Sequence, residues 1–140
     1  TIADDSGLQV DALQGAPGIY SARYAGEDAT DADNNAKLLD ALSGVPAGNR
    51  SAGFVCHLAI ADPTGAIQAS VEGKCRGLII EDDRGSQGFG YDPLFLVPEF
   101  HRTFGQLSLL VKSKISHRAR AFHLLRPELC RLFPPARRQV

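Results

Sequence analysis

The run Phe54-Val55-Cys56-His57-Leu58-Ala59-Ile60-Ala61 is almost wholly apolar, and it predicts a central strand that is buried on both faces. It is followed by Asp62-Pro63-Thr64-Gly65, whose residue types favour a tight turn. From residue 67 to residue 76, apolar or small side chains alternate with polar and charged ones, which is typical of a half-exposed strand. These segments predict an antiparallel hairpin within a sheet, and residues 78–80 are expected to extend its second strand.

The clearest helical pattern precedes this hairpin and covers residues 30–43. Thr30 suits the N-cap position, and Asp33 three residues later gives a weak capping box. Gly44 and Pro46 follow the last apolar position, and both residue types are typical of the end of a helix.

A second helix is predicted near the C-terminus, over residues 112–125, with Ile115, Ala119 and Phe122 on its core face. Pro127 is expected to interrupt it, because proline lacks the backbone N–H that a helix interior needs. A further short turn of helix and a tail rich in proline and arginine are expected to complete this end of the chain.

The remaining segments are expected to complete one α/β domain. Residues 2–11 predict short extended pieces that are broken at Asp5-Ser6-Gly7, and residues 15–18 predict a loop. Residues 85–90 predict another loop, which leads into a short strand over residues 91–96.

Length and charge limit the classes of protein to consider. The chain has 140 residues, which fits one domain with its own core. Its formal net charge is −1, so it has no global field that would attract nucleic acid or an anionic membrane. No apolar run approaches the roughly 20 residues that span a bilayer. The predicted partners therefore include neither nucleic acid nor membrane.

The cysteine pattern indicates a compartment. Cys56, Cys75 and Cys130 are widely spaced and odd in number. This argues against a disulfide framework and against a zinc site. We therefore predict a cytoplasmic protein, with its thiols kept reduced.

Three short runs carry side chains suited to a nucleoside triphosphate. They are Asp4-Asp5-Ser6-Gly7, then Gly88-Phe89-Gly90-Tyr91-Asp92-Pro93, then Lys112 with Ile115-Ser116-His117-Arg118. The carboxylates of the first suit Mg²⁺, which prefers one or two carboxylates together with water and phosphate oxygens. The aromatic rings of the second can stack on a purine, and the cations of the third can contact phosphate or base oxygens.

Each run also has an interpretation that involves no ligand. Aspartate is common in Asx-turns, Phe89 and Tyr91 are typical core residues, and a basic run is typical of a solvated helix face. His117 and Arg118 are adjacent, so on a regular helix their side chains diverge by about 100°. Both reach one ligand only near the start of a helix or at a break, and Ser116 is suited to cap such a break.

The three runs resemble the inosine triphosphate pyrophosphatase family, also described as HAM1-like or dITP/XTP pyrophosphatases. The longest similar block contains Ala3-Asp4-Asp5-Ser6-Gly7-Leu8 and Gly15-Ala16-Pro17-Gly18, and Ser116-His117-Arg118 follows in the family's order. The similarity covers about residues 1–125 and leaves residues 126–140 as a tail. It implies an α/β fold in which helices flank an elongated, mixed and largely antiparallel sheet. It also implies hydrolysis of ITP, dITP and XTP to the monophosphate and pyrophosphate, which cleanses the nucleotide pool.

The resemblance also implies roles for individual residues. Asp5 matches the proton acceptor and metal ligand, and the implied cofactor is Mg²⁺. The implied substrate-binding residues are Ser6, Phe89, Gly90, Tyr91, Asp92, Lys112, His117 and Arg118. An acceptor at Asp92 near N1 and a donor at Arg118 near O6 select 6-keto purines over adenine. The resemblance further implies a homodimer.

Relatives in this family carry an N-terminal segment with a strand, a Ser/Thr-x-x-Asn-x-x-Lys phosphate-binding loop and further acidic metal ligands. This chain has no methionine and opens on Thr1, so we expect residues 1–140 to be the C-terminal two-thirds of such a protein. The alternative function is therefore an inactive fragment or a nucleotide-binding module. A phosphatase for an unrelated phosphate ester would explain Asp5 and the basic run, but it would leave Phe89 and Tyr91 unused.

Overall fold

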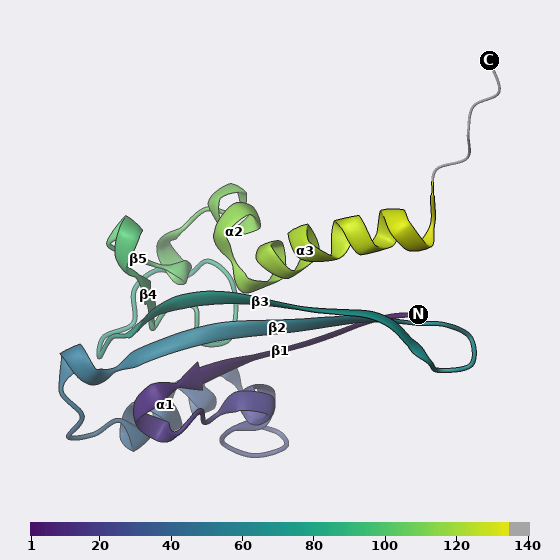
Figure 1. Ribbon diagram of the computed structural model, residues 1–140. Helices are drawn as coiled ribbons and strands as arrows, with labels where there is room; N and C mark the ends of the chain where they lie inside the picture. Colours follow the sequence, from purple (N-terminus) through teal and green to yellow (C-terminus); the bar gives the residue numbers. More distant parts are fainter. Residues whose placement is uncertain (135–140) are drawn as a thin grey trace.

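The computed structural model describes residues 1–134 and contains a five-stranded sheet in the order β1-β2-β3-β4-β5. All neighbouring strands in it are antiparallel, so the predicted α/β class with a largely antiparallel sheet is confirmed. The strands are β1 (Ile2–Val10), β2 (Ser51–Ala61), β3 (Ile67–Ile79), β4 (Phe95–Val97) and β5 (Arg102–Thr103). Figure 1 shows the long hairpin of β2 and β3 at the centre of this sheet.

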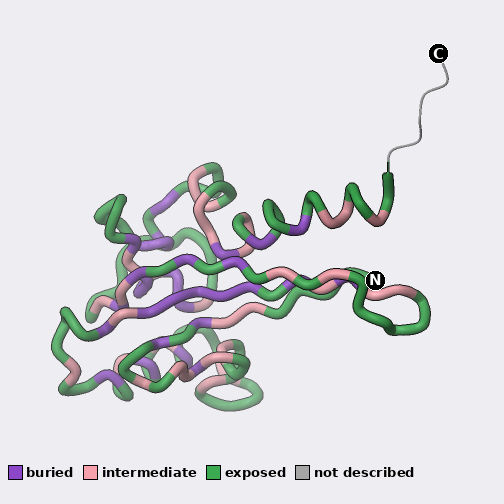
Figure 2. The backbone as a smooth tube through the Cα atoms, viewed as in Figure 1, coloured by how far each residue is buried: buried purple, intermediate pink, exposed green. Residues whose placement is uncertain are grey.

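The predicted hairpin is confirmed, but burial on both faces does not extend over the whole run 54–61, because His57 is exposed and Ala59 and Ala61 are half-buried. Residues 52–56 of β2 are all buried, because both faces of this strand are covered, whereas exposed and more buried residues alternate along β3. Figure 2 shows this contrast, with the longest buried stretch of the sheet along β2. The second strand extends to Ile79, as the apolar residues after position 76 predicted.

The predicted break at Asp5-Ser6-Gly7 is wrong. Each residue from Ile2 to Val10 has a partner in β2, so β1 is one continuous strand. Gly7 serves close packing there, since a Cβ at this position would lie 2.2 Å from the carbonyl oxygen of Gly18. The same three residues suit a turn and a tightly packed strand, and cross-strand pairing decides between them.

The predicted strand over residues 91–96 begins only at Phe95. Residues 91–94 form a turn, in which the backbone N–H groups of Leu94 and Phe95 donate to the carbonyl of Tyr91 at 3.0 and 3.1 Å. The turn places Tyr91 and Leu94 in the core, so their apolar character reflects burial and not a strand.

Helix α1 (Asp31–Ala41) confirms the first helix prediction, with Thr30 as its N-cap. The capping box is also confirmed: Thr30 Oγ1 accepts from the N–H of Asp33, and the Asp33 carboxylate accepts from the N–H of Thr30. Within residues 1–134, five 3₁₀ helices connect the larger elements: η1 (Asp11–Leu13), η2 (Gly18–Arg23), η3 (Ala47–Asn49), η4 (Pro98–Phe100) and η5 (Phe104–Gln106).

The single helix predicted over residues 112–125 is wrong, because two helices meet at Ser116. Helix α2 (Leu109–Ile115) ends there and helix α3 (His117–Leu132) begins. Ser116 has an extended backbone, with ψ at 160°, which breaks the helical path. This break changes the helical phase, so α3 buries His117, Ala121 and Leu125 and leaves Phe122 52% exposed.

Pro127 does not interrupt α3, which continues to Leu132. The second half of the helix packs Leu125, Leu129 and Leu132 against apolar residues of β2 and β3, and this burial offsets the missing hydrogen bond. Residues 126–132 of the predicted tail are therefore helical, and residues 135–140 lie outside the described part of the chain.

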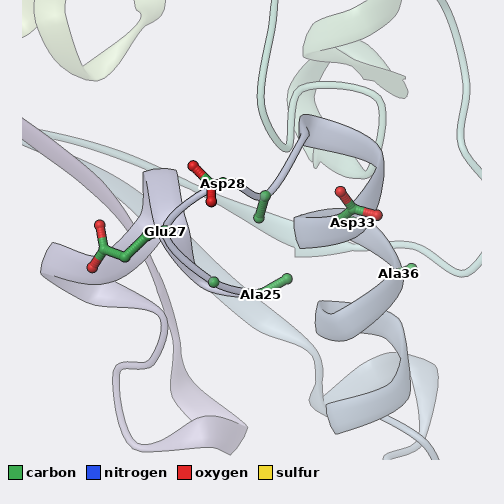
Figure 3. A pocket seen from close by; sticks show the side chains of 7 residues that line it. Ala25, Glu27, Asp28, Asp33 and Ala36 are labelled. Carbon is green, nitrogen blue, oxygen red and sulfur yellow. The ribbon is translucent and has the colours of Figure 1, made fainter.

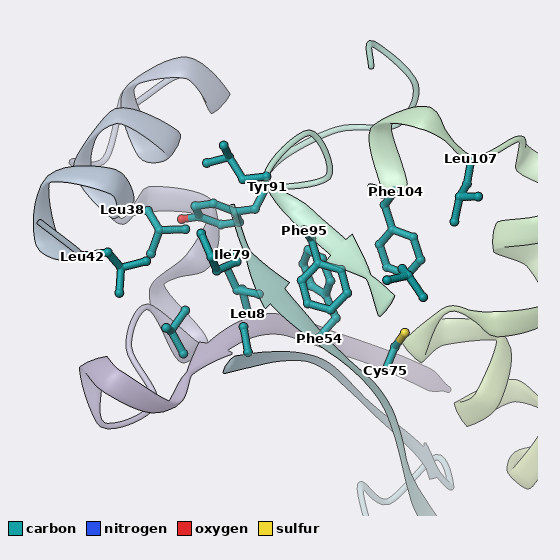
Figure 4. Close-up of a cluster of buried hydrophobic side chains, with 14 residues drawn as sticks. Leu8, Leu38, Leu42, Phe54, Cys75, Ile79, Tyr91, Phe95, Phe104 and Leu107 are labelled. Carbon is teal, nitrogen blue, oxygen red and sulfur yellow. The ribbon is translucent and has the colours of Figure 1, made fainter. Parts of the chain in front are cut away.

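The elements enclose two apolar clusters. Helix α3 lies over β2 and β3 and covers the smaller cluster, while α1 and η2 lie beyond β1 (Figure 1). The larger cluster joins α1 to the sheet and to β4 and η5 (Figure 4). Within it the centroid of the Phe54 ring lies 4.7 Å from that of Phe95 and 5.9 Å from that of Phe104.

No helix within residues 1–134 is long and apolar enough to cross a membrane.

The packing of α3 on β3 depends on Gly73, and this predicts a specific instability. A Cβ at Gly73 would lie 2.3 Å from the backbone nitrogen of Ala121 and 2.3 Å from the carbonyl oxygen of His117. Gly73→Ala should therefore lower the free energy of unfolding by about 1–3 kcal/mol, as overpacking usually does. Urea denaturation measures this change. Gly48→Ala is the matched control, because a Cβ at Gly48 meets no heavy atom within 4 Å. Equal midpoints for the two variants would contradict the argument.

Candidate functional site

A cavity of about 390 Å³ lies where β1, η2, α1, the loop of residues 88–92 and the α2–α3 junction meet. All eight residues predicted to bind substrate line it: Ser6, Phe89, Gly90, Tyr91, Asp92, Lys112, His117 and Arg118. Ser6 precedes the other seven by more than 80 residues in the sequence, so the fold brings the first run to the other two.

The loop of residues 88–92 is held by the carboxylate of Asp92. Its Oδ2 accepts hydrogen bonds from the backbone N–H of Phe89 at 3.0 Å and from Lys112 Nζ at 2.5 Å. Gly88 has φ at +81°, and a Cβ there would lie 2.0 Å from the Asp92 carboxylate. A side chain at position 88 would therefore displace the ion pair between Asp92 and Lys112.

The two aromatic residues of this loop have different surroundings. The Phe89 side chain is 65% exposed, and Lys112 Nζ and Arg118 Cζ each lie 5.8 Å from its ring centroid. Tyr91 is buried, its hydroxyl donates to the carbonyl of Ser21 at 2.7 Å, and burial raises its pKa. Phe89 can therefore stack on a ligand, whereas Tyr91 forms the cavity wall and anchors the loop to η2.

The break at Ser116 brings His117 and Arg118 to the same cavity. Ser116 Oγ accepts from the N–H of Ala119 at 3.2 Å and so caps α3, as the sequence suggested. His117 and Arg118 occupy the first two positions of α3, where neighbouring side chains need not follow the direction of a continuous helix face. Both side chains line the cavity.

His117 is only 8% exposed, and its ring stacks on that of Phe54 with centroids 4.9 Å apart. Burial lowers the pKa of His117 to about 4, with a further contribution from the positive charge of Arg118. Its Nδ1 is buried and has no hydrogen-bond partner among the described residues. The imidazole is therefore neutral at pH 7, and the side chain lines the cavity while its Nδ1 atom is buried.

Arg118 is oriented by Asp4, since its Nε donates to Asp4 Oδ2 at 3.1 Å. The Ser6 hydroxyl donates to the other carboxylate oxygen of Asp4 at 2.9 Å. Partial burial by itself raises the pKa of Asp4, but the hydrogen bonds from Arg118 and Ser6 and the charge of Arg118 outweigh it and hold this pKa below its ordinary value. The Asp4 carboxylate is therefore held by Arg118 and Ser6.

Asp5 lies on the opposite face of β1 from Asp4 and Ser6, because successive side chains alternate across a strand. It lines a smaller depression of about 80 Å³, which shares Ser6 and Gly7 with the main cavity. His57 is its cross-strand neighbour. Within residues 1–134, the carboxylate of Asp5 makes no side-chain hydrogen bond or ion pair. The predicted proton acceptor thus lies beside the cavity and not in it.

A different hollow, of about 580 Å³, lies between the loop of residues 25–29 and α1 (Figure 3). The acidic side chains on it are Glu27, Asp28 and Asp33, and among the described residues no cationic side chain lines it. Asp33 is already occupied in the capping box of α1. This hollow would repel phosphate, so the candidate nucleotide site is the cavity that contains Phe89.

Two polar residues of the cavity were missed by the sequence analysis. Asp31 accepts from the N–H of Gly90 at 2.7 Å, and Ser21 Oγ accepts from the N–H of Leu8 at 2.8 Å. Ser21 lies just after the similar stretch of residues 15–18, whereas Asp31 resembles any acidic residue in the first turn of a helix. Arg23 is not among the predicted site residues, and it is paired with Glu27 at 3.5 Å.

The low pKa of His117 predicts a pH effect on stability. A histidine whose folded pKa lies below its unfolded value stabilises the fold fully above about pH 6.5 and loses this contribution as the pH falls toward 4. We expect the free energy of unfolding to fall by roughly 3 kcal/mol across this window through His117. His117→Phe, which keeps a ring against Phe54, should remove this part of the pH dependence, and the exposed His123→Phe should not. Urea unfolding at pH 7, 5.5 and 4 tests it, and parallel curves for wild type and His117→Phe would contradict it.

A model of the Ham1 family matches residues 1–128. A curated relative, the dITP/XTP pyrophosphatase of Rhodopirellula baltica, is 55% identical over 94% of this chain and 63% of that protein. The dITP/XTP pyrophosphatase of Desulforamulus reducens is 54% identical over 94% of this chain and 65% of that protein. The chain therefore spans less than two thirds of the length of these relatives.

Solved structures agree with these similarities. The Staphylococcus aureus Ham1 protein shares 47% identity and a TM-score of 0.86, over 91% of this chain and 65% of that one. A HAM1 protein from Coxiella burnetii shares 42% identity and the same TM-score of 0.86, over 93% of this chain and 66% of that one. Because the family model covers nearly the whole chain and these relatives share its sequence and its fold, the chain belongs to the Ham1 family.

Proposed function

We propose that the protein hydrolyses non-canonical purine nucleoside triphosphates, namely ITP, dITP and XTP, to the monophosphate and pyrophosphate. The observation that carries this proposal is the cavity, in which two cationic groups each lie 5.8 Å from the centroid of an exposed aromatic ring. The printed names of the relatives, dITP/XTP pyrophosphatase, support the same substrate class. Hydrolysis of these nucleotides would remove damaged bases from the nucleotide pool.

Base recognition is assigned to Phe89, Asp92 and Arg118. The exposed ring of Phe89 stacks on the purine. Lys112 and the N–H of Phe89 both bind the Oδ2 atom of Asp92, and the Oδ1 atom makes no hydrogen bond within residues 1–134. This free oxygen accepts the N1 proton that hypoxanthine and xanthine carry and adenine lacks. The guanidinium of Arg118 donates to O6.

Lys112 and His117 support this pocket. The Lys112 side chain is only 14% exposed and is paired with Asp92, so it fixes the acceptor. Neutral His117 lines the cavity with its ring stacked on Phe54, and it would contact a ligand there. Ser6, on the strand between the cavity and Asp5, lies where the sugar or the first phosphate would pass.

The metal and the water are assigned to Asp5. Its carboxylate is exposed and unpaired among the described residues, which fits Mg²⁺, since this ion prefers one or two carboxylates with water and phosphate oxygens. Residues 1–134 contain no cluster of three His, Cys, Asp or Glu side chains that could hold a metal alone. When bound, Mg²⁺ would neutralise phosphate charge. Asp5 accepts the proton of the attacking water as a phosphoanhydride P–O bond breaks.

The proposal includes a homodimer in a reducing cytoplasm. The three cysteines are free in the structure, which fits a compartment that keeps thiols reduced. Leu109 and Leu110 are both exposed at the start of α2, where Leu109 also lines the cavity, and a partner chain would cover this apolar pair at the edge of the site.

Substrate preference tests the proposed function. With the full-length protein and Mg²⁺, kcat/KM for ITP and XTP should exceed that for ATP by up to about 10⁴-fold, because a site that binds a substrate N–H rejects an analogue without it. Pyrophosphate release measures the three rates. Equal rates for ITP and ATP would rule out base recognition by Asp92 and Arg118.

The role of Asp5 has its own test. Asp5→Asn keeps the size of the side chain and removes its charge, so we expect turnover of ITP to fall by about 10²–10⁴-fold. ITP binding, measured by calorimetry, should remain. The matched control is Asp82→Asn, an exposed acidic residue outside both depressions. Full activity of Asp5→Asn would remove this residue from the mechanism.

A further inference from the structure

Helix α1 contacts the loop of residues 88–92 through two side chains that bind one residue. Asp31 Oδ2 accepts a hydrogen bond from the backbone N–H of Gly90 at 2.7 Å. Asn35 Nδ2 donates to the backbone carbonyl of Gly90 at 3.1 Å. Both polar backbone groups of Gly90 are therefore bound by the same helix.

The spacing of Asp31 and Asn35 along α1 lets both side chains reach Gly90. Residues four apart on a helix lie on the same face, and Asp31 and Asn35 have this spacing. The capping box of Thr30 and Asp33 fixes where the helix begins, so it also fixes the position of Asp31. The clamp thus rests on a helix whose first turn is held independently of the loop.

Gly90 needs such a restraint. Its φ is +59°, in the left-handed region, and glycine populates positive and negative φ about equally when nothing selects one. Asp31 accepts from the N–H of Gly90 and Asn35 donates to its carbonyl, and together these two partners select one of these conformations.

The orientation of the Phe89 ring depends on this choice. On its other side, the loop is anchored by Asp92 Oδ2, which binds the N–H of Phe89 and Lys112. The ring itself is largely exposed, and its centroid lies 5.8 Å from Lys112 Nζ and 5.8 Å from Arg118 Cζ. Backbone anchors on both sides of Phe89 therefore set its direction more than packing does.

We propose that Asp31 and Asn35 are positioning residues that hold Gly90 and thereby aim the Phe89 ring at the base in the cavity. This inference rests on the proposed function, because it assigns these residues to recognition of the same purine. Asp31 also lines the cavity, so the clamp lies directly beside the ligand space. The expected consequence is a change in ITP affinity and base preference, with little change in the chemical step.

The main test uses Asp31, because this residue is exposed and its replacement does not disturb the core. In the full-length protein, Asp31→Ala should raise the KM and the calorimetric Kd for ITP about tenfold, with kcat changed less than twofold, and should reduce the preference for ITP over ATP. Asp31→Asn removes the same charge but keeps an acceptor oxygen, so it should restore most of the affinity. Asp40→Ala, an exposed aspartate on the same helix, should behave as the wild type.

A second measurement reports on the clamp itself. Amide exchange at Gly90, followed by NMR, should be faster in Asp31→Ala than in the wild type and unchanged in Asp40→Ala. Asn35→Asp places an acceptor against the Gly90 carbonyl, so it should weaken ITP binding in the same way. The inference is overturned if Gly90 exchange does not change, or if exchange rises while ITP affinity and base preference stay at the wild-type values.

These outcomes are separable from failure of the proposed function. If the wild-type protein fails to hydrolyse ITP, the proposed function falls, and the Kd for ITP with Gly90 exchange still decides the inference. If the wild type hydrolyses ITP and the Asp31 and Asn35 variants do not differ from it, the inference falls and the proposed function stands. If the wild type does not bind ITP at all, both are overturned.

Discussion

The site depends on the ion pair between Asp92 and Lys112, whose side chains are only 7% and 14% exposed. A buried pair is stable only where further hydrogen bonds satisfy its atoms, and the N–H of Phe89 provides one of them. The backbone of Asp92 is equally engaged, since its carbonyl accepts from the N–H of Gly105 at 2.9 Å. One residue thus joins the loop, α2 and the segment after β5. Loss of either charge would leave the other buried without a partner.

The α2–α3 junction also shapes the cavity through a single residue, Ser116. Ser116 ends one helix and caps the next, so the chain changes direction between Ile115 and His117. A continuous helix would send His117 and Arg118 in directions about 100° apart. The break lets a buried neutral imidazole and a guanidinium ion-paired with Asp4 line one cavity. The local irregularity therefore brings an uncharged imidazole and a charged guanidinium to one cavity.

Prediction from the sequence succeeded where a local pattern and the tertiary structure agree. The apolar run of β2, the alternation along β3 and the capping box of Thr30 each describe a preference that packing reinforces. It failed where packing overrides a local signal: Gly7 suits a turn, but β1 stays paired, and Pro127 breaks helices, but α3 continues. Asp31 was missed because its role depends on a contact 59 residues away, which no local pattern shows.

The adjacent carboxylates of β1 have separate roles because a strand alternates its side chains. Asp4 faces the cavity and is bound by Arg118 and Ser6, while Asp5 faces the other side and is unpaired within the described residues. The two therefore do not bind one cation together from a regular strand. Under the proposed function, a base stacked on Phe89 and a phosphate near Asp5 lie on opposite faces of β1. Ser6 and Gly7 line both depressions, so a nucleotide that reached both would pass beside these two residues. A Cβ at Gly7 would lie 2.2 Å from the carbonyl oxygen of Gly18, so a side chain there would disturb the packing of β1 on η2.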